Sequence, residues 1–267
     1  MPIGIFDSGI GGLTVANAIS RLLPNENIIY FGDTAHMPYG DKSIELIRSY
    51  AIRISKFLIE KKQCKAIVIA CNTASAAAYE FLRDELKGVI PVINVIDPMI
   101  ERIIGDDHIK KVGIIATKTT IASGIYQEKL ARRKPTLKYA ALATPLLAPM
   151  IEEGFYDNSI SELVLENYLT HTELNEIDAL VLACTHYPLI KPQISSYYHN
   201  AVQILDSAEV VALKLKSILE VEKLINLQKG SALINTFFVT DYTKSFEKTA
   251  ENFYSKHIDL NRIPFWE

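Results

Sequence analysis

Short apolar runs alternate with stretches of helical periodicity along most of this chain. The runs that predict strands are Ile3–Phe6, Asn27–Phe31, Ala66–Ala70, Pro91–Val95, Lys111–Ala116, Asp178–Ala183 and Leu233–Val239. Between them, apolar residues recur at helical spacing, which predicts helices at Leu13–Leu23, Ile44–Leu58, Thr73–Leu86 and Tyr242–Tyr254, with another beginning at Asp97-Pro98. This alternation predicts an α/β fold with mostly parallel sheets flanked by helices.

Two pairs of segments repeat at nearly the same separation. Val112–Thr117 resembles Ile3–Ser8 at an offset of 109 residues, and the strand ending at Cys184 follows the strand ending at Cys71 by 113 residues. Each match alone is weak, because short apolar strands resemble one another. Their agreement in order and spacing predicts two pseudo-symmetric α/β lobes with a crevice between them. We expect the first lobe in residues 1–96, with the tail 207–267 returning to it, and the second in residues 97–206.

Composition narrows the class of protein. The chain has 267 residues, of which 49% are hydrophobic, enough to fill one large core or two smaller ones. A formal net charge of −3 gives no basic excess for a nucleic acid, so a small-molecule partner is expected. The start of the chain resembles a strand rather than a signal segment, and Ala66–Ala78 is too short and too polar to cross a membrane. We therefore expect a cytoplasmic protein with no membrane partner.

Cysteine placement is the strongest chemical signal. Cys71 and Cys184 each follow a predicted strand directly, at the carboxyl ends where open parallel sheets bind ligands. Each also precedes a predicted helix, whose N-terminus favours a thiolate and lowers its pKa. The three cysteines of the chain do not suggest disulfides. A lone cysteine is usually a small buried hydrophobe, but paired placement beside Asn72-Thr73 and Thr185-His186 favours chemistry.

Two other kinds of cysteine site are considered. Cys184 and His186 are possible zinc ligands, but the chain has neither a C-x-x-C nor an H-x-x-x-H pattern, so no metal is expected. Nucleophilic hydrolysis by Cys184 with a nearby base stays open. It gives no reason for the second cysteine, at Cys71.

Polar turns near the cysteine strands suggest an anion site. The loop Asp7–Gly12 has glycines that let backbone N–H groups approach an anion, but it lacks a phosphate-loop lysine, so carboxylate binding fits better. Hydroxyls of Thr117, Thr119 and Thr120 would reach the same crevice. For these threonines and for Ser8, helix capping is an equally good interpretation. Glu152 with Glu153 is expected to be a solvated pair.

Together these motifs resemble bacterial glutamate racemases over nearly the whole chain. The segments that carry the resemblance are Gly4–Leu13, Tyr30–Ser43, Ala70–Ala76, Val112–Tyr126, Asp178–Leu189 and the tail from Phe237. The sequence departs from the family pattern at Ala183, where glycine is usual, and at Thr144, where many relatives have cysteine.

The resemblance implies interconversion of L- and D-glutamate without pyridoxal phosphate, metal or other cofactor, supplying D-glutamate for peptidoglycan. It implies that Cys71 takes the α-proton from D-glutamate and Cys184 from L-glutamate. Asp7 would support Cys71, while Glu152 and His186 would support Cys184. The substrate contacts implied are Asp7, Ser8, Tyr39, Gly40, Asn72, Thr73, Thr185 and His186.

Two competing functions stay open on the sequence. A related racemase acting on aspartate or hydantoins would share the fold and the paired cysteines. A two-lobed binding protein would share the crevice but would not need two thiols at strand ends. The sequence leaves a homodimer open.

Overall fold

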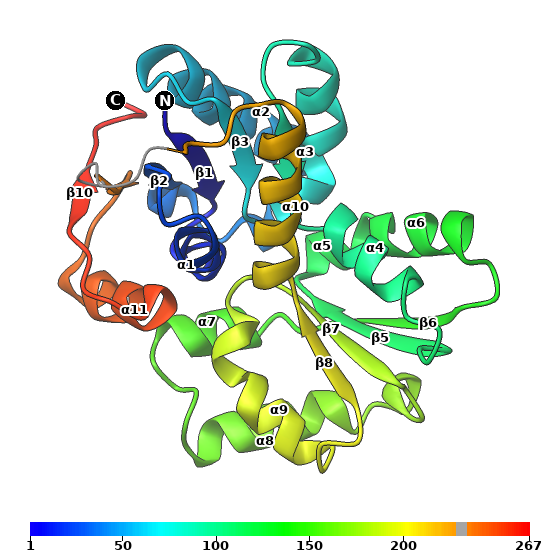
Figure 1. The fold of residues 1–267 in the computed structure, drawn as a ribbon. Coiled ribbons are helices and arrows are strands. Elements are labelled where there is room, and N and C mark those ends of the chain that lie inside the picture. Colours follow the sequence, from blue (N-terminus) through cyan, green and yellow to red (C-terminus); the bar gives the residue numbers. More distant parts are fainter. Residues whose placement is uncertain (228–233) are drawn as a thin grey trace.

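Two separate parallel sheets organise the molecule, and each forms the centre of one lobe (Figure 1). The computed structural model describes residues 1–227 and 234–267. Of the predicted strand Leu233–Val239, Leu233 therefore lies outside the described residues. The predicted α/β fold with two lobes is confirmed.

The first sheet has six strands in the order β10-β9-β2-β1-β3-β4, all paired in parallel. In chain order they are β1 (Ile3–Asp7), β2 (Ile28–Gly32), β3 (Ala66–Ile69), β4 (Val92–Asn94), β9 (Thr236–Val239) and β10 (Leu260–Arg262). Its helices are α1 (Leu13–Leu22), α2 (Ile44–Lys56), α3 (Asn72–Glu85), α10 (Ser207–Val221) and α11 (Lys244–Tyr254). Short helical turns at Thr34–His36 and Tyr39–Asp41, and a π-helical turn at Phe57–Lys61, complete this part.

The second sheet has four parallel strands in the order β6-β5-β7-β8. They are β5 (Lys111–Ala116), β6 (Lys138–Ala143), β7 (Ala179–Ala183) and β8 (Gln203–Asp206). The helices from β4 to β8 are α4 (Asp97–Ile104), α5 (Lys118–Ala122), α6 (Ile125–Arg133), α7 (Leu147–Glu152), α8 (Ser159–Leu169) and α9 (Lys191–Tyr197), with short turns at Thr172–Leu174 and Tyr187–Ile190.

The two sheets share one strand order at their centres. The sequence β2-β1-β3-β4 in the first sheet corresponds to β6-β5-β7-β8 in the second. In this correspondence β1 matches β5 and β3 matches β7, the same pairs that repeat in the sequence. The predicted pseudo-symmetry is therefore confirmed, and it places Cys71 and Cys184 at equivalent strand ends.

Continuous burial explains why the central strands are easy to recognise. Every residue of β1, β3 and β7 is buried, as expected for parallel strands covered on both faces. Local capping sets several helix starts: the Ser43 side chain accepts from the Leu46 amide at α2, and Pro98 lies in the first turn of α4. Among the described residues, no helix has the length and apolar character needed to span a membrane.

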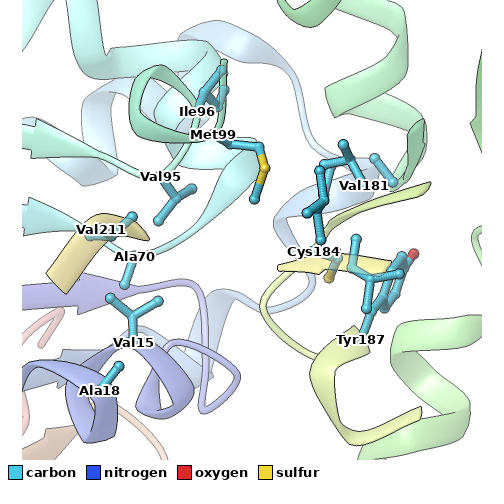
Figure 2. Close-up of a cluster of buried hydrophobic side chains, with 14 of the residues drawn as sticks. Val15, Ala18, Ala70, Val95, Ile96, Met99, Val181, Cys184, Tyr187 and Val211 are labelled. Atoms are coloured by element: carbon cyan, nitrogen blue, oxygen red, sulfur yellow. The ribbon is translucent and has the colours of Figure 1, made fainter. Parts of the chain in front are cut away.

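An apolar core continues from one lobe into the other. Figure 2 shows Met99 of α4 between Val95 and Ala70 on one side and Val181 and Cys184 on the other. Helix α10, which follows β8 in the chain, contacts α1 and α4. The lobes therefore meet over packed side chains close to the ends of β3 and β7.

The tail of the chain extends the first sheet. Strand β9 pairs with β2, and β10 pairs with β9 at the sheet edge. The sequence did not indicate β6, β8 or β10. These strands are short or partly exposed, and Lys138–Ala143 has no buried residue, so they lack the continuous apolar run that marks β1 and β7.

Candidate active site

The two predicted cysteines line one cavity between the lobes. Cys71 follows β3 and is the N-cap residue of α3, and Cys184 follows β7. Both side chains are buried, at 5% and 7% exposure. The cavity has a volume of about 30 Å³, and its lining is Ser8, Met37, Pro38, Tyr39, Gly40, Cys71, Asn72, Thr73, Thr117, Ala148, Glu152, Ala183, Cys184, Thr185 and His186.

Two hydrogen bonds and a nearby carboxyl group surround the Cys71 thiol. Its Sγ accepts from the Ala74 amide at 3.4 Å, and the thiol lies 3.6 Å from the Ser8 hydroxyl, to which it donates. Burial and the nearby Asp7 carboxylate raise the pKa of Cys71 and these two hydrogen bonds lower it, so that the pKa lies at about 12. The expectation of a lowered pKa at this helix N-terminus is therefore wrong, because desolvation outweighs the effect of the helix N–H groups.

Asp7 lies at the end of β1, behind the cavity lining. Its Oδ2 accepts from the amides of Gly9 and Gly12, each at 3.1 Å, while Oδ1 has no hydrogen-bond partner among the described residues. Burial raises the pKa of Asp7, and His186 and the backbone N–H groups partly oppose that effect. A buried oxygen without a partner is costly, so this carboxyl is available for a further donor or proton.

Cys184 lies beside a histidine–glutamate pair. The Cys184 Sγ is 3.6 Å from His186 Nδ1, and His186 Nε2 is 2.7 Å from Glu152 Oε1. Burial alone lowers the pKa of His186, but Glu152 and Cys184 more than compensate, so this pKa lies well above 6.5. The expectation that Glu152 is solvated is wrong, since it faces the buried imidazole with its side chain 17% exposed. Cys184 is followed by the short 3₁₀ turn Tyr187–Ile190 before α9, so it does not begin an α-helix.

A cluster of threonine hydroxyls closes the cavity on another side. Thr73 of α3 lies 3.0 Å from Thr117 and 3.2 Å from Thr120, and Thr117 donates to Thr120 at 3.0 Å. Thr117 also caps α5, so its capping and site roles coexist. Thr120 lies behind the lining and completes the cluster, while Thr119 donates to the Gly40 carbonyl across the lobes at 2.7 Å.

Three further residues predicted to contact the substrate, Asn72, Tyr39 and Thr185, line the cavity, but some of their polar atoms already bond to other residues. The Asn72 Oδ1 accepts from Tyr126 at 2.7 Å, while its Nδ2 has no partner among the described residues. Tyr39 lines the cavity, but its hydroxyl donates to Asp33 at 2.7 Å. Thr185 lines the cavity beside Cys184.

Several cavity-lining residues could not be predicted from the sequence, because their side chains carry no reactive or polar group. Met37, Pro38, Ala148 and Ala183 add apolar lining. The long turn after β2 was the only signal for the first two. Gly11 permits contact between the lobes, since a Cβ there would lie 2.5 Å from His186 Nδ1.

The described residues contain no group of three or more histidine, cysteine, aspartate or glutamate side chains that could hold a metal ion. The site instead combines two thiols, two carboxyls, one histidine and a set of hydroxyls. Fold and site together define a two-lobed α/β protein with a pair of buried thiols on one interlobe cavity.

Comparison with known proteins agrees with that description, and the chain belongs to the Asp/Glu/Hydantoin racemase family, which it matches over residues 9–215. A glutamate racemase from Chlorobaculum tepidum is 44% identical over 247 residues, which is 92% of this chain and 90% of that protein. One from Syntrophus aciditrophicus is 39% identical over 257 residues, or 96% and 94% of the two chains. The crystal structure of Francisella tularensis glutamate racemase in complex with D-glutamate matches with a TM-score of 0.90 and 40% identity, covering 99% of this chain and 98% of its own.

Proposed function

We propose that this protein interconverts L- and D-glutamate by a two-base mechanism without a cofactor. One observation carries the proposal: thiols from equivalent strand ends of two lobes line the same cavity. Inverting a stereocentre through a planar carbanion requires that a proton leave one face and another arrive at the opposite face. Two monoprotic groups, one thiolate and one thiol, perform this in either direction.

In this mechanism the two cysteines exchange roles with direction. The Cys71 thiolate takes the α-proton of D-glutamate while the Cys184 thiol donates its proton to the opposite face. For L-glutamate, Cys184 is the base and Cys71 the acid. Either cycle leaves one thiolate and one thiol, so the proton count is conserved. Asp7 is placed to handle protons for Cys71, and His186 with Glu152 for Cys184.

The charge of the substrate explains how a thiolate forms in a buried site. Burial and Asp7 both disfavour the ionised form of Cys71. A bound α-ammonium group brings a positive charge into the same space, which lowers the pKa of a nearby thiol. The base is therefore generated when the amino acid binds.

Hydroxyl and N–H groups are suited to the two carboxylates of glutamate. We assign substrate contacts to Ser8, Asn72, Thr73, Thr117, Thr120 and Thr185, and to the Tyr39–Gly40 turn. Asp7 and His186 have groups suited to the ammonium and to a carboxylate, respectively. The Nδ2 of Asn72 supports this assignment, because it is a buried donor with no hydrogen-bond partner in the described part of the chain.

The closed cavity implies that the lobes separate for binding. A volume of about 30 Å³ holds a few waters at most and excludes glutamate. We propose that residues 97–206 move relative to residues 1–96 and 207–267. The parallel addition of β9 to the first sheet supports grouping the tail with the first lobe. Closure over the substrate would then exclude water and strengthen each polar contact.

Exchange in deuterated water tests the function directly. The protein is incubated separately with L-glutamate and L-aspartate, and each product is analysed for α-deuterium and chirality. Deuterium at Cα together with D-glutamate is the expected result. Binding of glutamate without exchange would indicate a receptor, and exchange confined to aspartate would indicate the related racemase. By family, we propose that the D-glutamate formed supplies peptidoglycan synthesis.

A further inference from the structure

The proposed mechanism makes no use of a buried carboxylate that lies close to the cavity. Asp33 follows β2 and has no exposed surface. Its oxygens accept from Tyr39 Oη at 2.7 Å, Thr240 Oγ1 at 3.0 Å and Trp266 Nε1 at 2.7 Å, and His36 Nδ1 lies 3.1 Å from both. A buried carboxylate needs such donors to offset its lost hydration. We call these five residues the Asp33 cluster.

The donors of the Asp33 cluster come from distant parts of the chain. Tyr39 belongs to the turn that lines the cavity, whereas Thr240 follows β9 and Trp266 is next to the last residue. One carboxylate thus connects the C-terminal segment to the wall of the active site. The link reaches the second lobe, because Gly40 packs on Thr117 closely enough that a Cβ would lie 2.8 Å from Thr117 Cβ.

The Trp266 ring is held from several sides. Its centroid lies 4.6 Å from that of His36 and 5.1 Å from that of Tyr50, and the Arg53 guanidinium lies 4.7 Å from the ring. These contacts fix the direction of the indole N–H. Packing therefore holds the ring in the orientation that the hydrogen bond from Trp266 Nε1 to Asp33 requires.

We propose that Trp266 is a positioning residue for the active site: its indole N–H holds the Asp33 carboxylate, and Asp33 holds Tyr39 and Gly40 in the cavity wall. The reaction positioned here is the glutamate racemisation proposed above. Without the N–H, Asp33 Oδ1 keeps Thr240 and His36 among the described residues, so the carboxylate is freer to shift toward other donors. Tyr39 shifts with it, and the turn that contacts the substrate is less well ordered before binding.

Trp266→Phe isolates this hydrogen bond, since it keeps an aromatic ring and removes the N–H. The matched control is Phe57→Leu, which disturbs the neighbouring aromatic packing by removing ring contacts to Phe31, Phe238 and Phe265, none of which belongs to the Asp33 cluster. Hydrogen exchange in the ligand-free proteins is the first readout. We expect faster exchange in residues 37–42 for Trp266→Phe only, with the Lys42 amide, bonded to the Tyr39 carbonyl, as reporter. Equal exchange in both variants would overturn the proposal.

Steady-state kinetics is the second readout. For Trp266→Phe we expect the KM for glutamate to rise roughly three- to tenfold, while kcat stays within about twofold. Phe57→Leu should lower the melting temperature without changing KM. In Trp266→Phe/Tyr39→Phe, the KM should equal that of Tyr39→Phe alone, because both changes break one connection. If the two substitutions instead raise the KM by independent factors that multiply in the double variant, the proposed connection through Asp33 is contradicted.

The two readouts separate this inference from the function on which it rests. If the wild-type protein does not racemise glutamate, the proposed function fails, and the exchange experiment still decides whether Trp266 orders the Tyr39–Gly40 turn. If the wild type is active and Trp266→Phe behaves like Phe57→Leu, only the positioning role fails.

Discussion

His186 Nδ1 lies 3.6 Å from the Sγ of Cys184. The equivalent thiol, Cys71, has the Ser8 hydroxyl at the same distance instead. The two halves of the pseudo-symmetric site thus differ in their supporting groups. Cys71 has the Ser8 hydroxyl and the Asp7 carboxyl nearby, whereas Cys184 has the His186 imidazole, which in turn contacts the Glu152 carboxyl. This asymmetry makes the individual steps of a two-base reaction distinguishable by mutation.

Replacing His186 by Asn should lower kcat/KM about 10- to 100-fold, because the proposed proton-handling group of Cys184 is lost. The factor must be the same from L- and from D-glutamate, since enantiomers have equal free energies and the equilibrium constant is one. The asymmetry should appear only in kcat and KM taken separately. Initial rates in both directions measure this. An unchanged kcat in both directions would remove His186 from the mechanism.

Much of this site was predictable because strand ends and turns are local features. Cys71 and Cys184 follow buried strands, and their equivalent positions could be inferred from two similar offsets in the sequence. The lining by Ser8, Tyr39, Gly40, Asn72, Thr73, Thr117 and Thr185 agrees with the predicted location of these residues. Their catalytic and binding roles stay predictions.

Other features depend on contacts between distant segments. The raised pKa of Cys71 follows from burial and from Asp7, which a pattern of residues does not measure. The sequence predicts that Glu152 is solvated, because its partner His186 lies far from it in the chain and the contact forms only in the folded protein. The Asp33 cluster joins residues separated by more than 200 positions, as the Asp33 contacts with Thr240 and Trp266 show.

The three cysteines allow a matched test of the two-base mechanism. Cys71→Ala and Cys184→Ala should each lower kcat by at least about a thousandfold, because one face of the carbanion loses its acid or base. Cys64→Ala is the control: Cys64 is also a buried thiol, but it packs against Gly4 and does not line the cavity. D-glutamate formation is measured by chiral chromatography. Full turnover by either cavity variant would falsify the mechanism.

Glu152→Gln should change how stability depends on pH. Glu152 helps to raise the pKa of His186 well above its unfolded value near 6.5. A histidine whose pKa is raised by folding stabilises the protein fully below the unfolded pKa, and this stabilisation is lost as pH rises through the folded pKa. The variant should therefore melt about 5 °C below the wild type at pH 6, and the difference should shrink toward pH 10.

The neighbouring acid provides the control for that experiment. Glu153 is exposed, so Glu153→Gln changes the same net charge without touching His186. Its melting curve should follow the wild type at every pH. A difference for Glu152→Gln that stays constant with pH would mean that the pair stabilises the protein by packing and not through the charge of His186.

Gly11 controls how closely the lobes approach. A Cβ at this position would lie 2.5 Å from His186 Nδ1 and 2.8 Å from Thr185 Oγ1, distances that real Cβ contacts do not show. Gly11→Ala should therefore push the second lobe away and lower kcat/KM at least about tenfold, since small displacements of a reacting group are costly. Gly9→Ala in the same loop should be much milder, because its Cβ would meet only the flexible Met37 side chain, at 3.4 Å. Equal losses in the two variants would show that the loop conformation, and not the contact between lobes, requires glycine.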